Sequence, residues 1–374
     1  MSREFSRRAF VATAGAMAAG FLASYPLNAS VDTYDLEMPP ESKSLRDHAT
    51  TKGLLYGAAT QRSILQGDPA FAAVFAEQCG LLVPENELKW DVVRPTPETY
   101  NFAPADWLYA FTQQNRMKFR GHTLAWNKSL PSWFDSYANS GNARQLLLGH
   151  IATVVGRYAG KMHSWDVLNE AIEPGDKRPD GLRDSPWLNL LGPEYIDIAF
   201  HAAAEADPQA LLVWNEIHTE FNWARANREA FVQNLKTRIS RGVPIHAVGL
   251  QSHLWANVPS YGEDFISFLK TLTDMGLKIL ITEMDVMDSE IPGDVPVRDQ
   301  IVAKIYHDYL SVVLPHKSVV AVFTWGLSDR FTYLTKYKPR KDGGPVRPLP
   351  LDSNLNPVPA WDSIARAFDD AEPR

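Results

Sequence analysis

Eight apolar, strand-like runs recur along this chain, with helix-like stretches of 3.6-residue periodicity between them. Strands that are apolar on both faces and alternate with helices indicate a parallel sheet covered on both sides. Eight such units predict an α/β fold, a single (β/α)8 TIM barrel. A doubly wound open sheet is the alternative, but no glycine-rich phosphate loop follows the first run. The runs are 54–60, 81–86, 118–126, 163–170, 210–217, 247–253, 278–285 and 319–329, and the clearest helix-like stretches are 143–158, 194–206, 223–241, 298–314 and 359–368.

Composition and charge narrow the class of protein. The chain has 374 residues, 45% of them hydrophobic, which is enough apolar material for a large folded core. Its formal net charge of -7 makes nucleic acid an unsuitable partner. Cys79 is the single cysteine, so no intrachain disulfide is possible, and we expect it to be a buried apolar residue. We expect a monomer that needs no cofactor and no metal.

The N-terminus carries a targeting pattern. Arg7 and Arg8 stand just before a weakly hydrophobic, alanine-rich run at 11–23, which resembles a twin-arginine export signal. The run is too short for a stable membrane anchor. We therefore predict a signal peptide at 1–29, a polar linker at 30–50 and the barrel at 51–374. The protein is then exported already folded and is periplasmic or secreted.

Polar side chains close six of the predicted strands. The carboxyl ends of barrel strands meet at one mouth, where barrel enzymes hold their active sites. One polar residue at a strand end is often a helix cap, but six strand ends loaded with carboxylate, amide, imidazole and indole are hard to explain by capping. These residues are Glu85, Asn86, Lys89, His122, Trp126, Asn169, Glu170, Gln251, His253, Glu283, Asp285 and Trp325.

The period of two along a strand suggests how some of them cooperate. Glu283 and Asp285 point to the same side of one strand, and Gln251 and His253 to the same side of its neighbour. This allows an Asp285–His253–Glu283 chain, in which the imidazole keeps Glu283 oriented and ionised. An ionised carboxylate held in this way suits a nucleophile.

Glu170 is the candidate proton donor. It comes from the other side of the mouth, and we expect a raised pKa that lets it protonate a leaving oxygen and later deprotonate water. Such a carboxylate pair is the minimal machinery for breaking a glycosidic bond, and a retaining mechanism predicts carboxyl groups roughly 5–5.5 Å apart. Spacing alone leaves Glu216, in a second Asn-Glu pair, as a competing acid; we interpret it as a structural residue or a polar residue on the aglycone side.

Taken together, the motifs ENELKW, RGHTLAWN, WDVLNEAI, GLQSH, ITEMD and WGLSD resemble glycoside hydrolase family 10, the endo-β-1,4-xylanases, in family order from 54 to 368. The resemblance implies that xylan or xylo-oligosaccharides are the substrate, with Glu170 as acid/base and Glu283 as nucleophile. It also implies substrate-binding roles for Glu85, Asn86, Lys89, His122, Trp126, Asn169, Gln251, His253 and Trp325, with Asp285 in support.

The chain departs from the family pattern at three places. Asn127 stands where a second histidine is usual, and Ile217 replaces a tyrosine after the fifth strand. Tyr333 stands where a second tryptophan usually closes over the substrate, and we expect it to cover less sugar surface there. These changes affect which polysaccharide chain the cleft binds, whereas the two catalytic carboxylates are both present.

Two long loops are expected to shape the groove. Residues 173–193 carry Arg178, Arg183 and Trp187, and residues 331–351 carry a set of lysines and arginines. A cationic loop is most often simply solvated; the weaker hypothesis is that 331–351 attracts glucuronic acid side groups.

Two other enzyme classes remain open. A β-1,4-glucanase of similar shape would prefer carboxymethylcellulose to xylan. A metal-dependent barrel hydrolase would use His122, His253, Glu283 and Asp285 as ligands and lose activity on chelation.

Overall fold

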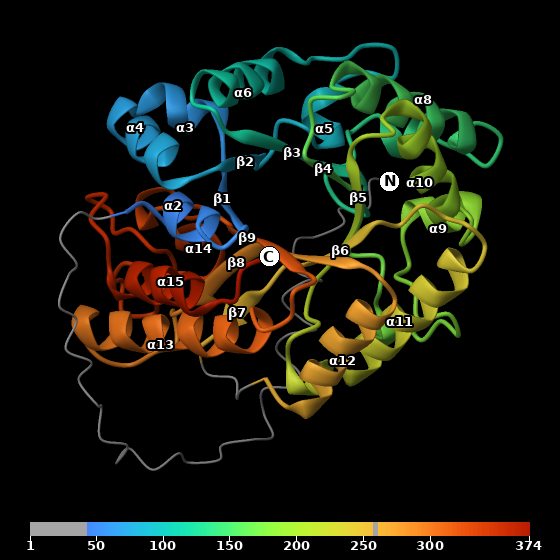
Figure 1. Ribbon diagram of the computed structural model, residues 1–374. Helices are drawn as coiled ribbons and strands as arrows, with labels where there is room; N and C mark the ends of the chain where they lie inside the picture. Colours follow the sequence, from blue (N-terminus) through green and yellow to red (C-terminus); the bar gives the residue numbers. More distant parts are fainter. Residues whose placement is uncertain (1–42, 257–260) are drawn as a thin grey trace. The chain divides into compact units, whose positions relative to one another are not determined.

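The computed structural model describes residues 43–256 and 261–374, and the chain divides into two units at Ser42. The predicted signal peptide and most of the predicted linker therefore lie outside the described residues. The unit from Lys43 to Arg374 is a (β/α)8 barrel, as predicted, with helices around the strands (Figure 1).

Eight parallel strands close the barrel. Each pairs with the next, β6 pairs with β8, and β9 returns to β1. A short ninth strand, β7, continues beyond β6 and pairs with the end of β8. The strands are β1 (Leu55–Thr60), β2 (Leu81–Pro84), β3 (Lys118–Ala125), β4 (Ser164–Asn169), β5 (Leu211–Glu216), β6 (Ala247–Leu250), β7 (His253–Trp255), β8 (Lys278–Met287) and β9 (Val319–Thr324).

The helices follow the predicted order. Each of the five helix-like stretches contains a helix within a few residues of the expected bounds. The helices are α2 (Leu45–Thr50), α3 (Arg62–Gly67), α4 (Pro69–Gln78), α5 (Trp90–Val93), α6 (Ala103–Gln114), α7 (Phe134–Tyr137), α8 (Ala143–Arg157), α9 (Pro186–Leu191), α10 (Tyr195–Ala206), α11 (Arg225–Ile239), α12 (Glu263–Asp274), α13 (Val295–Val313), α14 (Leu334–Tyr337) and α15 (Pro359–Asp370), with 3₁₀ turns at Pro174–Asp176, Asn222–Ala224 and Asp329–Phe331.

Three boundaries differ from the predictions. Residues 45–50, assigned to the linker, form α2, which begins with a capping box between Ser44 and Asp47 and buries Leu45 and Ala49. The sixth predicted strand is interrupted between Leu250 and His253, where Ser252 has φ 61°. The eighth ends at Thr324 because the chain turns at Gly326, with φ 111°.

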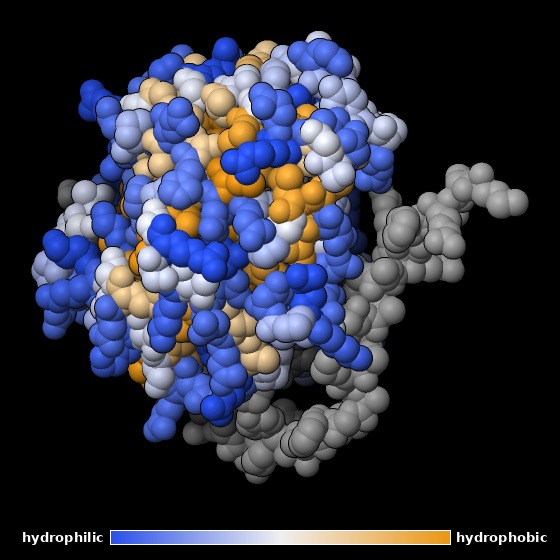
Figure 2. All heavy atoms as spheres, turned by 90° about the vertical axis from the view of Figure 1, so that its right-hand side faces the viewer, coloured by the Kyte–Doolittle hydropathy of each residue, from blue (hydrophilic) through white to orange (hydrophobic). Residues whose placement is uncertain are grey.

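The core has two layers. A smaller cluster fills the barrel interior with residues such as Val83, Leu280 and Phe323 from β2, β8 and β9. A larger cluster lies between the strands and the surrounding helices, and it holds Cys79 fully buried, as predicted. Figure 2 shows apolar side chains gathered near the middle of one face, with hydrophilic side chains around them. Among the described residues, no helix combines the length and apolarity needed to cross a bilayer.

Candidate active site

Glu283 lies near the carboxyl end of β8, with only 5% of its surface exposed. Asn215 Nδ2 donates a 2.7 Å hydrogen bond to Glu283 Oε1, and His253 Nε2 lies 3.2 Å from Glu283 Oε2. Burial raises the pKa of this carboxyl, but the bond from His253 and the electrostatic influence of His122 and His253 outweigh burial and lower the pKa. Glu283 is therefore ionised.

The predicted Asp285–His253–Glu283 chain is present. His253 Nδ1 lies 3.0 Å from Asp285 Oδ1, so the imidazole bridges two carboxylates. Burial lowers the pKa of His253, yet Asp285 and Glu283 together raise it well above its usual value. The prediction that Gln251 and His253 lie on the same face of one strand is wrong. The strand ends at Leu250, Ser252 has a positive φ, and His253 begins the next strand, β7.

Tyr333 extends this chain outward. Its ring packs edge-on against the His253 imidazole, with centroids 6.1 Å apart. Burial raises the pKa of Asp285, and interactions with His253 and with the Tyr333 hydroxyl only partly offset that rise. Tyr333 thus turns its hydroxyl toward Asp285, which in turn contacts His253 beside Glu283.

Glu170 follows the last residue of β4 and has φ 52°, an uncommon conformation for a residue with a side chain. Lys128 Nζ lies 3.0 Å from Glu170 Oε2, and Gln251 Nε2 lies 3.3 Å from Glu170 Oε1. Arg183 Nε donates a 2.6 Å hydrogen bond to the backbone oxygen of Glu170. The carboxyl group is thus held on both oxygens and next to two cations.

These contacts overturn the predicted pKa direction of Glu170. Burial raises the pKa, but the charges of Lys128 and Arg183 and the hydrogen bonds from Lys128 and Gln251 lower it to about 2. The prediction of a raised pKa is wrong because it did not include a lysine at this carboxylate.

Three amides connect the two carboxylates. Asn215 Nδ2 donates to Asn169 Oδ1 at 2.8 Å as well as to Glu283. Gln251 Nε2 lies 3.3 Å from Asn169 Oδ1 and also contacts Glu170. Thr282 Oγ1 donates to Asn215 Oδ1 at 2.6 Å and fixes which end of that amide faces Glu283. A continuous path of hydrogen bonds therefore joins Glu170 to Glu283.

Glu216 has a different role from the carboxylate pair. Its side chain is 1% exposed, and Oε1 accepts hydrogen bonds from the backbone nitrogens of Ala171 and Ile172 and from Trp214 Nε1. Burial raises the Glu216 pKa to about 8. Glu216 anchors the backbone just after Glu170, which supports its interpretation as structural.

Lys89 lies between aromatic and acidic groups at the mouth. Its Nζ is 5.3 Å from the Trp126 ring centroid, 5.8 Å from that of Trp325 and 3.4 Å from Asn86 Oδ1. Burial lowers its pKa, and the charges of Glu283 and Glu85 oppose that shift. The structure therefore brings the predicted second-strand residues to the same place as Trp126, Trp325 and Glu283.

His122 is fixed from inside the barrel. Its Nδ1 lies 3.0 Å from Asp166 Oδ2, and Asp166 also forms an ion pair with the buried Arg120. Gly121 allows this packing, because a Cβ there would lie 2.0 Å from the Trp165 ring. His122 also packs against Trp325, with ring centroids 5.3 Å apart.

An aromatic group follows β5, where the family tyrosine is missing. The Phe221 and Trp223 rings stack with centroids 5.3 Å apart, and Trp255 lies 5.3 Å from Phe221. His218 contacts all three rings. Trp223 is 53% exposed, so this group, here called the aromatic shelf, presents an indole to solvent.

The two long loops contribute less than expected to an open groove. Trp187 is 1% exposed and packs against Trp90 and Phe134 in the core. Arg183, however, supports Glu170.

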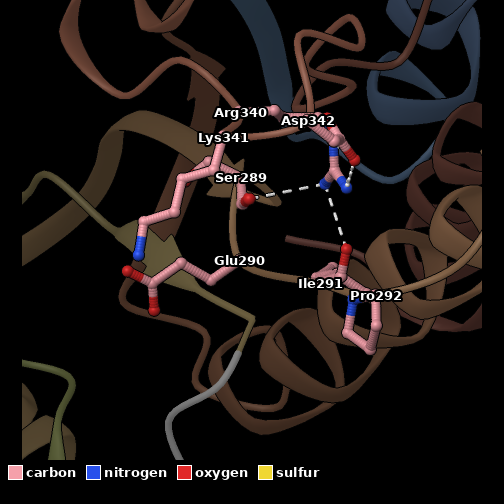
Figure 3. Close-up of a pocket in the computed structure, with 7 residues that line it drawn as sticks. All are labelled: Ser289, Glu290, Ile291, Pro292, Arg340, Lys341 and Asp342. Carbon is pink, nitrogen blue, oxygen red and sulfur yellow. Dashed lines mark hydrogen bonds and ion pairs between the residues drawn. The ribbon is translucent and has the colours of Figure 1, made fainter.

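The cationic loop uses its arginines internally. Arg347 pairs with Asp299. Arg340 binds Asp342 and the backbone oxygens of Asp288, Ser289 and Ile291, and Figure 3 shows its contacts with Asp342, Ser289 and Ile291. This arginine borders a pocket of about 400 Å³, into which Lys341 points toward Glu290. Because both arginines are already paired, they do not support the hypothesis of glucuronate attraction.

Sequence reasoning missed Lys128 and Asn215. Asn215 was visible beside Glu216 at the end of the fifth strand, and Lys128 stands two residues after Trp126. Asn215 lies inside the predicted fifth run, and Lys128 lies two residues beyond the end of the third run.

Comparison with known proteins identifies the family. The profile of Glycosyl hydrolase family 10 matches residues 44–367. The chain is 36% identical to Endo-1,4-beta-xylanase 3 of Hypocrea jecorina over 92% of this chain and 91% of that protein. It is also 36% identical to Beta-1,4-xylanase of Dictyoglomus thermophilum, over 76% and 81%. Xylanase 10B from Thermotoga petrophila, solved in complex with xylobiose, matches with TM-score 0.81 and 30% identity over 89% and 99%. The chain belongs to glycosyl hydrolase family 10.

Proposed function

We propose that this protein is an endo-acting, retaining β-1,4-xylanase that hydrolyses internal bonds of xylan or xylo-oligosaccharides. Family membership and the printed names of the relatives support the substrate class. The observation that carries the proposal is the pair of carboxylates, Glu170 and Glu283, joined by amide hydrogen bonds.

The first step of this mechanism makes a glycosyl-enzyme. A Glu283 oxygen bonds to the anomeric carbon while the bond from that carbon to the leaving oxygen breaks. Protonated Glu170 gives its proton to that oxygen. The amides of Asn169 and Gln251 are placed to bind sugar hydroxyls, contacts that strengthen as positive charge develops.

The second step restores the enzyme. Glu170, now a carboxylate, takes a proton from water as the water oxygen bonds to the anomeric carbon. The bond from that carbon to Glu283 breaks, and the product keeps its original anomeric configuration. The expected carboxyl separation of roughly 5–5.5 Å remains a prediction of this mechanism.

Product analysis tests the proposal directly. NMR during hydrolysis of a xylo-oligosaccharide reports the substrate, the bond cut and the anomeric outcome. Initial release of the α-anomer, or cleavage only at chain ends, would contradict it. Glu283→Ala is expected to lower turnover roughly 10⁴- to 10⁶-fold, with partial rescue by azide, whereas Glu205→Ala on the exposed face of α10 keeps normal turnover.

The two alternative enzyme classes have simple tests. Faster turnover of carboxymethylcellulose than of xylan would favour a glucanase. Activity that is lost on exhaustive chelation would favour a metal-dependent hydrolase. Against the latter, both ring nitrogens of His253 already face carboxylates.

We also propose export through the twin-arginine signal and a monomeric enzyme. Replacing Arg7 and Arg8 by lysine is expected to retain the protein in the cytoplasm of an exporting bacterial host. Light scattering of the purified protein measures the oligomeric state.

A further inference from the structure

A lysine side chain lies on the acid/base carboxylate. Lys128 comes from the loop after β3, and its Nζ lies 3.0 Å from Glu170 Oε2. The Lys128 side chain is 39% exposed, whereas that of Glu170 is 7% exposed. A partly exposed cation therefore contacts one oxygen of a buried carboxylate.

Charged and titratable groups on several elements surround this pair. From the loop after β4, Arg183 binds the Glu170 backbone oxygen and also pairs with Glu173 at 3.3 Å. Lys89 and Glu283 act on Glu170 from the second strand end and β8. Glu216 and His218 act from the end of β5, and burial lowers the His218 pKa to about 4. Lys128 differs from Arg183 and Lys89 because it contacts a carboxyl oxygen of Glu170.

The ion pair opposes the acid form of Glu170. An ammonium group 3.0 Å from Oε2 stabilises the carboxylate and makes the addition of a proton to Glu170 less favourable. The first step of catalysis nevertheless needs a protonated Glu170. Lys128 therefore opposes that step for as long as it stays on Oε2.

The Trp126 ring offers the Lys128 ammonium group an alternative contact. Its Nζ already lies 5.3 Å from the Trp126 ring centroid, within the range of a cation–π contact. Its four-carbon stem is flexible and partly solvated. A sugar that occupies the space beside Glu170 can therefore displace the ammonium group toward the Trp126 ring.

We propose, on the basis of the proposed function, that Lys128 is a positioning residue that holds Glu170 as a carboxylate in the free enzyme and is displaced by the leaving-side sugar. Glu170 then takes its proton from solvent only in the complex. After the first step Glu170 is again a carboxylate, and Lys128 returns to it as the leaving chain departs.

Direct titration of Glu170 tests the ion pair without any assay of activity. In carbon-13-labelled protein, NMR is expected to show a Glu170 carboxyl that titrates far below its usual value. In Lys128→Met its pKa is expected to rise by about 1–3 units, the effect of removing one close opposite charge. Lys128→Arg keeps the charge and is expected to keep the low value. An ordinary Glu170 pKa in the wild-type protein would overturn the proposal, even if the variants failed to fold.

The pH profile of kcat/KM tests the catalytic consequence. For xylo-oligosaccharides, the basic limb reports loss of the Glu170 proton in the free enzyme, so Lys128→Met is expected to move it to higher pH by the same 1–3 units. An aryl xylobioside with a dinitrophenol leaving group needs no proton, and its kcat/KM should not show the shift. Lys270→Met, which removes an exposed lysine paired with Asp274 on α12, is the matched control.

The outcomes separate this inference from the proposed function. If the basic limb stays in place while the Glu170 titration moves, Lys128 is an ion-pair partner without a catalytic role and the proposal is wrong. If xylan is not cleaved at all, the proposed function fails, while the titration still reports on the ion pair.

Discussion

Glu283 and Asp285 are two carboxyl groups on one strand with opposite pKa shifts. Both are buried, and both contact His253. Glu283 gains a second donor, Asn215, on its other oxygen and also the electrostatic influence of His122, whereas the second donor to Asp285 is the neutral Tyr333 hydroxyl. The donors and charges around each carboxylate decide whether interactions outweigh burial. Residue identity and spacing alone do not reveal these surroundings.

The His253 charge predicts a pH-dependent contribution to stability. Its pKa is raised in the folded protein, so its stabilising effect is fully present below the pKa of the unfolded chain and is lost as pH rises through the higher folded pKa. His253→Asn is expected to lower the free energy of unfolding by about 3–5 kcal/mol near pH 6, because it leaves two buried carboxyl groups without their cation. Urea unfolding of both proteins from pH 6 to pH 10 measures this difference.

The difference should shrink as pH increases, because the wild-type protein then loses the same charge. A difference that grows with pH would contradict a raised His253 pKa. His307→Asn provides the comparison, since it changes a histidine on α13 that is not part of the Asp285–His253–Glu283 chain.

At the scale of elements, β6 carries a glycine that the site depends on. A Cβ on Gly249 would lie 2.1 Å from Asn215 Oδ1 and 2.9 Å from Thr282 Cγ2. The Asn215 amide, which links Glu283 to Asn169, therefore occupies the space that a side chain at position 249 would fill. This explains why β6 has a glycine between Asn215 of β5 and Thr282 of β8.

Gly249→Ala is accordingly expected to displace Asn215 from Glu283. Turnover should fall on the order of 10²-fold, the cost of misplacing a catalytic group by about 1 Å. The fold should lose about 1–3 kcal/mol, which denaturant unfolding measures. Gly149→Ala is the matched control, because a Cβ there meets no atom within 4 Å. Equal effects of the two changes would show that Gly249 has no special role.

The aromatic shelf predicts a subsite that binds sugar units on the leaving-group (aglycone) side of the cleaved bond. Trp223 stacks on Phe221 and exposes its indole beyond His218, whose pKa is influenced by Glu170. Trp223→Ala is expected to raise KM about 3- to 10-fold for long xylo-oligosaccharides and to leave KM for short ones unchanged. Trp223→Phe should restore most of the affinity. A uniform change in kcat for all chain lengths would instead indicate a general effect on structure.

Elements were predictable from the sequence where one local pattern decides them. Strands such as β4 and β8 were found because apolar residues run to a polar end, and the relay on β8 followed from a period of two. The break between β6 and β7 was missed because it depends on a positive φ at Ser252, which the sequence does not mark. Lys128 was missed because its contact with Glu170 joins residues 42 positions apart.

At the scale of the whole molecule, the barrel begins earlier than its sequence pattern indicates. Leu45 of α2 is fully buried, and its backbone nitrogen donates to Gln78 Oε1 of α4, which also accepts from Trp361 Nε1 of α15. His48 Nδ1 lies 2.8 Å from Asp369 Oδ1, also on α15. The segment 45–50, which the sequence analysis assigned to the linker, is thus a helix that connects α4 with α15.

Truncation distinguishes a linker from a structural helix at these positions. Removal of residues 1–42 is expected to leave the free energy of unfolding unchanged. Removal of residues 1–50 also deletes α2, exposes the apolar surface beneath Leu45 and leaves the hydrogen bonds of Gln78 and Asp369 incomplete, so stability should fall by about 3–5 kcal/mol. The midpoints of urea unfolding measure both differences. Equal midpoints would mean that α2 adds nothing, and the boundary predicted at residue 51 would then describe the stable domain. A lower midpoint only for the longer truncation would mean that the stable domain includes α2 and begins before residue 51.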